Sequence, residues 1–344
     1  MTGRGRTGAD AHALEAEWSL YGVRLRSEHV FVNNVERADR RSLPNGDAVS
    51  FAYVDDVPLP QGWDGTAPTF ASAAKIADDT SFLYVLEVGV CSVLRFSEVV
   101  DFFVWPDRIL CRVLDPAYGF MVELHLLGFV MAFWLERRGV LALHAAGVAV
   151  HGHAIGFLAT NAGGKSSLAA SLMQVGHPLL SDDILPVEPG ERRPLVRPSY
   201  PQMRMWPETA RHFVGTTALP HVHPRLEKRR VPVGRGGFGR FERASLPLAV
   251  LYVPERVESG EVTFCDVSFA EATFALERYA FLAEMLTGTG LQRRRFATVA
   301  AVAATVPLRR VAYPTGLHLL PAVAAAIAAD AAEVTERRAS AAGG

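Results

Sequence analysis

Cysteine is scarce in this sequence. Its three copies, Cys91, Cys111 and Cys265, are odd in number and lie far apart, with no CxxC pair and no Cys/His spacing suited to zinc. Neither a disulfide framework nor a structural zinc site is therefore indicated. Positive charge is not in excess either, because 35 Lys and Arg face 36 Asp and Glu and the net charge is −1. Binding of nucleic acid through bulk charge normally needs a strongly basic face, so we expect no nucleic-acid partner.

Long apolar runs are absent as well. The most apolar run covers residues 124–135, between Glu123 and Glu136, and is too short to span a bilayer as a helix. The first 18 residues include basic side chains but no apolar stretch of the kind that marks a secretory signal. We therefore expect a cytoplasmic protein with no membrane partner. In the cytoplasm, three separate cysteines stay reduced.

The chain does have enough apolar residues for a large core. They make up 49% of 344 residues, and this length favours two domains. Short β-branched and aromatic runs predict an antiparallel meander, with strands over 82–88, 93–96, 99–104 and 108–114. Apolar residues at three- and four-residue spacing predict a helix over 118–138. We expect a disordered tail over 1–17, a β-rich N-terminal domain over 18–138, a catalytic domain over 139–338 and a second tail over 339–344.

The second half shows alternating strand and helix signals. Apolar runs predict strands over 140–143, 147–150, 154–159 and 246–253, whereas residues 57–79 of the first half read as a loop. Ser268 followed by Glu271 is a capping box that opens a predicted helix through residue 285. A final Ala-rich helix is expected over 321–338. Such alternation is typical of an α/β fold.

The most informative stretch is 155–172, in which an apolar strand leads into a Gly-rich turn and an Ala/Leu helix. A phosphate loop needs glycines for its backbone, a lysine for the phosphates, a hydroxyl for Mg²⁺ and a helix N-terminus behind it. The turn supplies these parts in order, as Asn161, Ala162, Gly163, Gly164, Lys165, Ser166 and Ser167. One departure is Ala159, where the usual motif begins with glycine. A chance GGKS turn is the weaker interpretation, because a strand precedes the turn and a helix follows it.

Two adjacent aspartates follow one helix and one short strand later. Asp182 and Asp183 lie 17 and 18 residues after Lys165, at the end of a predicted strand. A single strand–helix–strand unit would return them to the sheet edge that carries the loop. A carboxylate there can hold a metal or its water, or accept a proton from an attacking hydroxyl. A solvated turn at a strand end is the alternative interpretation.

These residues together resemble a known family. Residues 143–187 are similar to the catalytic core of bacterial HPr kinase/phosphorylase and its relatives, which include the stand-alone kinases of lasso-peptide biosynthesis. The matching positions, in order, are Leu143-His144, Lys165-Ser166, Gly176-His177 and Asp182-Asp183. Weaker similarity covers the rest of the chain, whose layout is closer to the peptide kinases. The resemblance implies a P-loop kinase core, related to that of phosphoenolpyruvate carboxykinase, after a smaller β-rich N-terminal domain.

The resemblance also implies roles for the matched residues. Lys165 and the loop would bind the ATP phosphates, Ser166 and Asp182 would hold Mg²⁺, and Asp183 would be the general base towards a serine hydroxyl. His144 falls beside the family's active site, although a core histidine bonded to backbone is an equal alternative. The bifunctional enzyme has an EIRG segment whose Glu helps to hold the metal, but here the segment is Gln202-Met203-Arg204-Met205. The loss of this Glu favours an enzyme that is only a kinase.

Other basic residues are candidates for the phosphates. Arg204 could reach a phosphate or serve as a structural arginine in a strand. The segment 225–243 is basic and Gly-hinged and could close over ATP, with Lys228 and Arg229 as its best candidates, or be a mobile solvated loop. RNA binding is less favoured, since only Phe238 and Phe241 could stack on bases.

The sequence therefore predicts an ATP- and Mg²⁺-dependent serine kinase that acts on a peptide or small protein, with a lasso-peptide precursor as one option. Two alternatives remain open: a kinase of a small hydroxylated metabolite, and a nucleotide-binding regulatory protein without transfer activity. The acceptor, the preferred nucleotide and the oligomeric state, with a homo-oligomer as one option, are left open.

Overall fold

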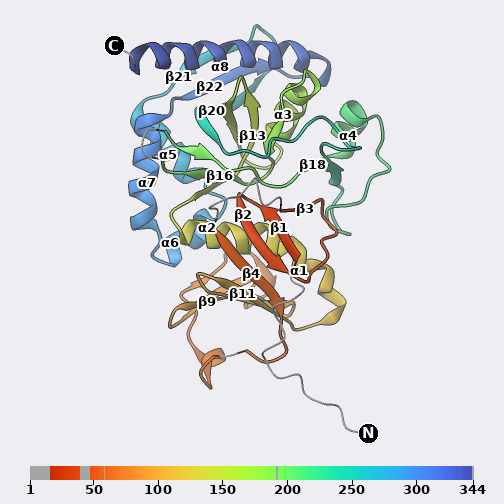
Figure 1. Cartoon of the computed structure of the whole chain (residues 1–344), viewed down its shortest axis with the longest axis vertical. Coiled ribbons are helices and arrows are strands. Elements are labelled where there is room, and N and C mark those ends of the chain that lie inside the picture. The colour runs from red at the N-terminus through yellow and green to blue at the C-terminus, as the bar shows by residue number, and fades with distance from the viewer. Residues whose placement is uncertain (1–15, 39–46, 58, 191–192, 343–344) are drawn as a thin grey trace.

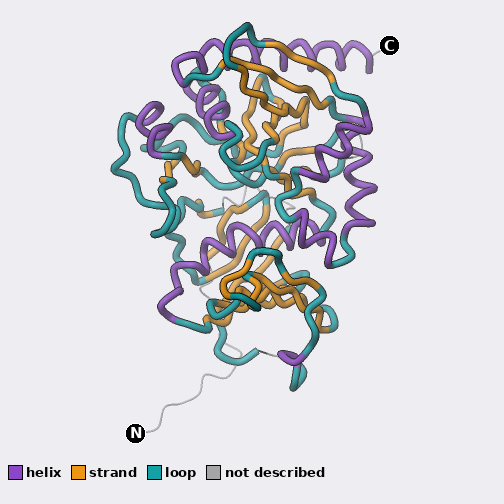
Figure 2. The backbone as a smooth tube through the Cα atoms, turned by 180° about the vertical axis from the view of Figure 1, so that it is seen from behind, coloured by secondary structure: helices purple, strands orange, loops and turns teal. Residues whose placement is uncertain are grey.

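The computed structural model describes residues 16–38, 47–57, 59–190 and 193–342, which form two β-sheets stacked along the long axis of the molecule (Figure 1). A helical segment crosses the middle of the molecule between the sheets, as Figure 2 shows from behind. It consists of α1 (Gly119–His125), one π-helical turn (Leu126–Val130) and α2 (Met131–Arg137). The sequence predicted this segment as a single helix, and its inward side chains are buried.

The N-terminal sheet has the strand order β3-β1-β2-β4-β11-β10-β9-β8-β5. Strands β8 to β11 form the expected meander, but β4 pairs in parallel with both β2 and β11, so the sheet is mixed. Antiparallel neighbours need only a tight turn, whereas long connections before and after β4 allow parallel pairing. The strands are β1 (Ala16–Leu20), β2 (Val23–Ser27), β3 (Glu36–Arg37), β4 (Ala48–Tyr53), β5 (Phe70–Ala71), β8 (Leu83–Val88), β9 (Cys91–Phe96), β10 (Val100–Val104) and β11 (Arg108–Val113).

The C-terminal sheet has the order β12-β16-β17-β20-β14-β13-β15, with β22 added to β20 and β21 added to β22. Strands β14, β20 and β22 are parallel, and β15 points the same way because β13 is antiparallel to both β14 and β15. Four carboxyl ends therefore meet at one edge, where α/β sheets bind their ligands. The strands are β12 (Leu141–Leu143), β13 (Ala145–Val150), β14 (His153–Leu158), β15 (Leu179–Ser181), β16 (Leu185–Glu188), β17 (Leu195–Val196), β20 (Leu246–Val257), β21 (Thr263–Asp266) and β22 (Leu308–Pro314).

Helices cover both faces of the C-terminal sheet, as the α/β interpretation requires. One apolar core gathers α3 (Lys165–Gln174), α4 (Pro207–Val214) and α8 (Leu320–Ala342), and another gathers α5 (Phe269–Arg278) and α7 (Gln292–Thr305). A two-stranded hairpin of β18 (Gln202–Met205) and β19 (Arg229–Pro232) lies beside α4. The helix α6 (Ala283–Gly288) instead packs under the N-terminal sheet, where Met285 and Leu286 join its core.

Several expected boundaries are wrong. The capping box of Ser268 forms, but its helix ends at Arg278 because the chain turns through 279–282 before α6. α7 was not predicted, and α8 continues to residue 342, into the expected tail. Ala16 and Glu17 begin β1, and residues 1–15 of the expected first tail lie outside the described residues. The expected loop over 57–79 contains η1 (Trp63–Gly65), β5 and the start of the hairpin β6 (Lys75–Ala77) and β7 (Thr80–Ser81).

Two helical segments are apolar over a longer stretch than the sequence analysis expected. Residues Pro116–Arg137 and Leu317–Arg338 are each long and apolar enough to cross a membrane by length and composition alone. In the first, 67% of the most apolar window is buried inside the protein, which is what a core helix shows. In the second the share is 33%, and its inward residues pack on α3 and the sheet.

A pair of cross-strand glycines lets one leucine reach the centre of the C-terminal sheet. Gly147 on β13 faces Gly156 on β14, and both lie under Leu185 of β16. A Cβ at Gly156 would lie 2.6 Å from Leu251 Cδ2 and 2.8 Å from Leu185 Cδ2. Such distances leave no room for a methyl group unless the core moves.

We therefore expect Gly156→Ala to lower the free energy of unfolding by about 1–3 kcal/mol, the usual cost of overpacking a core. Gly119→Ala is the matched control, because a Cβ at Gly119 meets nothing within 4 Å and the residue is helical. Urea unfolding of both variants gives the comparison. Equal stability of the two would contradict the packing described here.

Candidate functional site: a phosphate loop facing two aspartates

The Gly-rich turn joins the end of β14 to the start of α3. Gly164 caps the helix with φ 91°, and a Cβ there would lie 2.6 Å from Tyr313 Oη. A Cβ at Gly163 would lie 2.6 Å from the Cβ of Ala159. Both positions therefore favour glycine strongly. Ala159 has a negative φ and is buried, so its methyl group occupies space that Gly163 leaves free.

Lys165 folds back over this turn. Its Nζ donates to the carbonyl oxygens of Ala159 at 2.7 Å and Thr160 at 3.0 Å, and it lies 3.0 Å from His144 Nε2. Burial lowers the pKa of Lys165, while attraction to Asp183 and Asp182 opposes the shift. The ammonium is thus held at the loop by atoms of the loop itself.

Asp182 connects the loop to the neighbouring hairpin. Its Oδ1 accepts a hydrogen bond from Ser166 Oγ at 2.8 Å, and its Oδ2 accepts one from the backbone N–H of Arg204 at 2.8 Å. Burial, and then repulsion from Asp183, raises the pKa of Asp182 above its ordinary value in spite of both hydrogen bonds. The expectation that the aspartates return to the edge of the loop is therefore met at atomic distance.

Asp183 has a different environment. Its Oδ2 pairs with Arg204 Nη1 at 2.6 Å, whereas no described residue donates a hydrogen bond to its Oδ1. Burial alone would raise the pKa of Asp183, but attraction to Arg204 and then to His144 outweighs it, and the pKa lies below the ordinary value. The residue has φ 75°, a left-handed conformation that costs a non-glycine residue energy. The second oxygen of Asp183, Oδ1, accepts no hydrogen bond from the described residues, although His144 Nδ1 lies 3.6 Å from it.

His144 bridges the lysine and the second aspartate. Its Nδ1 lies 3.1 Å from the carbonyl oxygen of Asp183 and 3.6 Å from Asp183 Oδ1. Burial lowers the pKa of His144, although attraction to Asp183 acts in the opposite direction. A neutral ring that accepts from Lys165 at Nε2 carries its proton on Nδ1 and donates it towards Asp183. Both alternatives given for His144 are thus partly right, since it bonds backbone within the site.

The three basic candidates have different surroundings in the structure. Arg204 is engaged by the aspartates, so its guanidinium serves the acid pair before any phosphate. Lys228 lines the cavity, with its Nζ 5.4 Å from the ring centroid of Trp206. Arg229 begins β19 and contacts His221 and Glu227 instead of the cavity. Gln202 forms hydrogen bonds with Asn33 and Asn34 of the N-terminal region.

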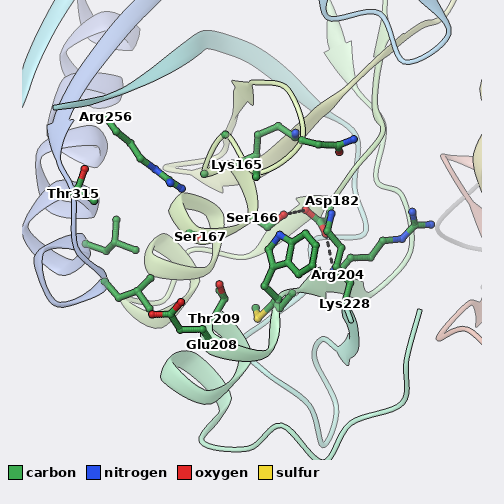
Figure 3. A pocket seen from close by; sticks show the side chains of 18 of the residues that line it. Lys165, Ser166, Ser167, Asp182, Arg204, Glu208, Thr209, Lys228, Arg256 and Thr315 are labelled. Carbon is green, nitrogen blue, oxygen red and sulfur yellow. Dashed lines mark hydrogen bonds between the residues drawn. The ribbon is translucent and has the colours of Figure 1, made fainter. Parts of the chain in front are cut away.

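One cavity of about 370 Å³ contains most of the predicted site residues, but His144, Arg229 and Gln202 do not line it (Figure 3). It holds all seven predicted loop residues, both aspartates, Arg204 and Lys228. It also contains residues that the sequence analysis missed or left unassigned, namely Trp206, Glu208, Thr209, Arg256, Tyr313, Thr315 and Gly316. Arg256 and Tyr313 come from β20 and β22, far along the chain. Arg256 lies beyond the predicted strand 246–253 and no strand was predicted at Tyr313, so no signal in the sequence indicated either residue.

Comparisons with known proteins add little to this geometry. No protein-family model and no curated protein sequence matches the chain. One similar solved structure is that of the Hpr(Ser) kinase/phosphatase from Coxiella burnetii, at 11% identity and a TM-score of 0.30. The match covers 58% of this chain and 97% of that chain. A likeness this distant carries no argument about function, and a relation to lasso-peptide kinases stays a prediction.

Proposed function

We propose that the protein is an ATP- and Mg²⁺-dependent kinase that transfers the γ-phosphate to a serine hydroxyl of a peptide or small protein. The observation that carries the proposal is the 2.8 Å contact between Ser166, at the start of a helix behind a Gly-rich turn, and Asp182, at the end of a neighbouring strand. P-loop enzymes hold their Mg²⁺ between a hydroxyl and a carboxylate in such positions.

The donor set suits magnesium. Ser166 and Asp182 offer two oxygen atoms, and Mg²⁺ prefers oxygen ligands while keeping waters and substrate phosphates in its remaining positions. Among the described residues there is no group of three or more His, Cys, Asp or Glu that could hold a metal. A site of two protein ligands completed by phosphates fits both facts. When bound, Mg²⁺ would neutralise charge on the β- and γ-phosphate oxygens.

Asp183 is the proposed general base. Its open Oδ1 would take the proton of the acceptor hydroxyl, while Arg204 holds the other oxygen and so fixes the plane of the carboxylate. His144 supports this orientation from the opposite side. A pKa below the ordinary value keeps Asp183 ionised but makes it a weak base, which suits phosphoryl transfer, because positioning and charge neutralisation supply most of the catalysis.

Transfer without the reverse phosphorolysis is part of the proposal. Gln202 matches, in the resemblance, the position of the metal-holding glutamate of the bifunctional family. Its side chain forms hydrogen bonds with Asn33 and Asn34 of the N-terminal region. The N-terminal sheet would then help to present the acceptor peptide, for which a lasso-peptide precursor is one option. All three cysteines are free, in keeping with a cytoplasmic enzyme.

Lys165→Ala is expected to abolish release of labelled γ-phosphate from ATP, both to water and to a library of serine-containing peptides. The ammonium neutralises charge that develops on the phosphates. Of the two carbonyl oxygens that it leaves, that of Thr160 belongs to an exposed residue and can be solvated by water. Lys75→Ala, in a hairpin of the N-terminal half, is the matched control. Thermal unfolding checks that each variant is folded. Turnover like the wild type in a folded Lys165→Ala variant would end the phosphate-loop hypothesis.

ATP should stabilise the protein only when Mg²⁺ is present, because Ser166 and Asp182 alone do not complete a metal site. At a hundredfold excess of ligand over Kd, the expected gain is about 2.7 kcal/mol. A thermal-shift titration of ATP with Mg²⁺ or with EDTA measures it. A full shift in EDTA would refute the metal role, and no shift in either buffer would contradict nucleotide binding at this site.

The two aspartates should respond differently to substitution. Asp183→Asn should lower transfer to serine about 10²–10⁴-fold, as expected for loss of a general base, and leave ATP binding nearly unchanged. Asp182→Asn should lower the rate and also raise the Mg²⁺ concentration needed for half-maximal activity. Measured rates across a Mg²⁺ titration separate the two roles. Exchanged phenotypes would reverse the assignment, and mild, equal effects would place the chemistry elsewhere.

A further inference from the structure

Two polar side chains reach the phosphate loop from the C-terminal half of the sheet. Arg256 on β20 and Tyr313 on β22 are register partners on neighbouring parallel strands, so their side chains leave the same face of the sheet. Both extend to the residue that caps α3. A Cβ at Gly164 would lie 2.6 Å from Tyr313 Oη and 3.2 Å from an Nη atom of Arg256.

Neither group has a polar partner in the part of the chain that the structure describes. Among the described residues, nothing donates to, accepts from or ion-pairs with the Arg256 guanidinium or the Tyr313 hydroxyl, although Tyr313 as a whole is only 3% exposed and lines the cavity. The guanidinium also lies at the N-terminus of α3, where the helix dipole is positive. Arg256 is exposed to solvent, whereas the Tyr313 hydroxyl is a buried donor. A cation and a buried, unpaired donor beside a positive helix end together make a favourable place for an anion.

We propose that Arg256 and Tyr313 form a second anion subsite that binds the non-transferred phosphates, the diphosphate shared by ADP and ATP. In Figure 3 Arg256 and Thr315 lie on the side of the loop opposite to Asp182 and Arg204. Transfer takes place beside the aspartates under the proposed function, on which this inference rests. Arg256, on the side of the loop away from the aspartates, would therefore bind the diphosphate that remains in ADP after transfer.

The experiment measures binding of Mg²⁺·ADP and Mg²⁺·ATP by calorimetry, without any acceptor. Arg256→Ala should weaken the binding of both nucleotides by the same factor, about 10- to 100-fold, which is the range for hydrogen bonds to a charged group. Arg256→Lys should recover part of the loss, because it restores the charge without the planar fork. Tyr313→Phe should weaken both nucleotides about threefold to tenfold, as loss of one hydrogen bond does.

Arg310→Ala is the matched control, because Arg310 lies on β22 but pairs with Glu271 outside the cavity. This variant should bind both nucleotides like the wild type. Unchanged binding by a folded Arg256→Ala variant would overturn the subsite while leaving the proposed function intact. A loss for ATP with none for ADP would overturn it too, because Arg256 would then act on the transferred phosphate. A wild-type protein that binds neither nucleotide would contradict the proposed function and the subsite with it.

Discussion

The site depends on how two adjacent carboxylates are kept at the edge of a sheet. Side by side and buried, Asp182 and Asp183 would repel each other strongly in a medium of low dielectric constant. The fold resolves this by giving them different partners. Asp183 takes the Arg204 guanidinium, and Asp182 takes a backbone N–H and a serine hydroxyl. Burial and this division of partners raise the pKa of Asp182 and lower the pKa of Asp183. The charge of Asp183 is therefore the more firmly held of the two.

That division depends in turn on β18, which presents both the backbone and the side chain of Arg204. The strand is held from its other side by the N-terminal region, where Gln202 bonds Asn33 and Asn34. Asn33 is itself fixed by the buried carboxylate of Glu123 on α1. The N-terminal half therefore takes part in positioning the acid pair, through one chain of hydrogen bonds that runs from the central helix to the cavity.

What could be predicted from the sequence follows from how local each feature is. The loop, Lys165, Ser166 and the aspartates belong to a single strand–helix–strand unit, so their order along the chain determines their geometry. His144 was expected beside the site only from the family resemblance, and it contacts Lys165 and Asp183 without lining the cavity. Arg256 and Tyr313 reach the loop only through the parallel pairing of β14 with β20 and of β20 with β22, and a sequence without sheet order does not contain that information.

Strand register also separated residues that look equivalent in the sequence. Lys228 and Arg229 are neighbours in one basic segment, but β19 begins at Arg229 and carries that side chain to His221 and Glu227, whereas Lys228 stays at the cavity. The parallel pairing of β4 was missed because only tight turns leave a mark on local sequence. Boundaries such as the break after Arg278 depend on α6 packing under the other sheet, a tertiary contact that the local sequence does not reveal, whereas the capping box at the start of the same helix forms as predicted.

The balance of charge in the cavity explains why side chains alone do not make a nucleotide site here. Lys165, Arg204, Lys228 and Arg256 face Asp182, Asp183 and Glu208, and the closest of these pairs, Arg204 with Asp183, cancels itself. What remains is too little positive charge for a polyphosphate. Under the proposed function the rest must come from the N-terminus of α3 and from a divalent cation on Ser166 and Asp182. Under that function the near-neutral cavity would couple nucleotide binding to the metal, because a cation held by the acid pair would attract the phosphates that the carboxylates alone repel.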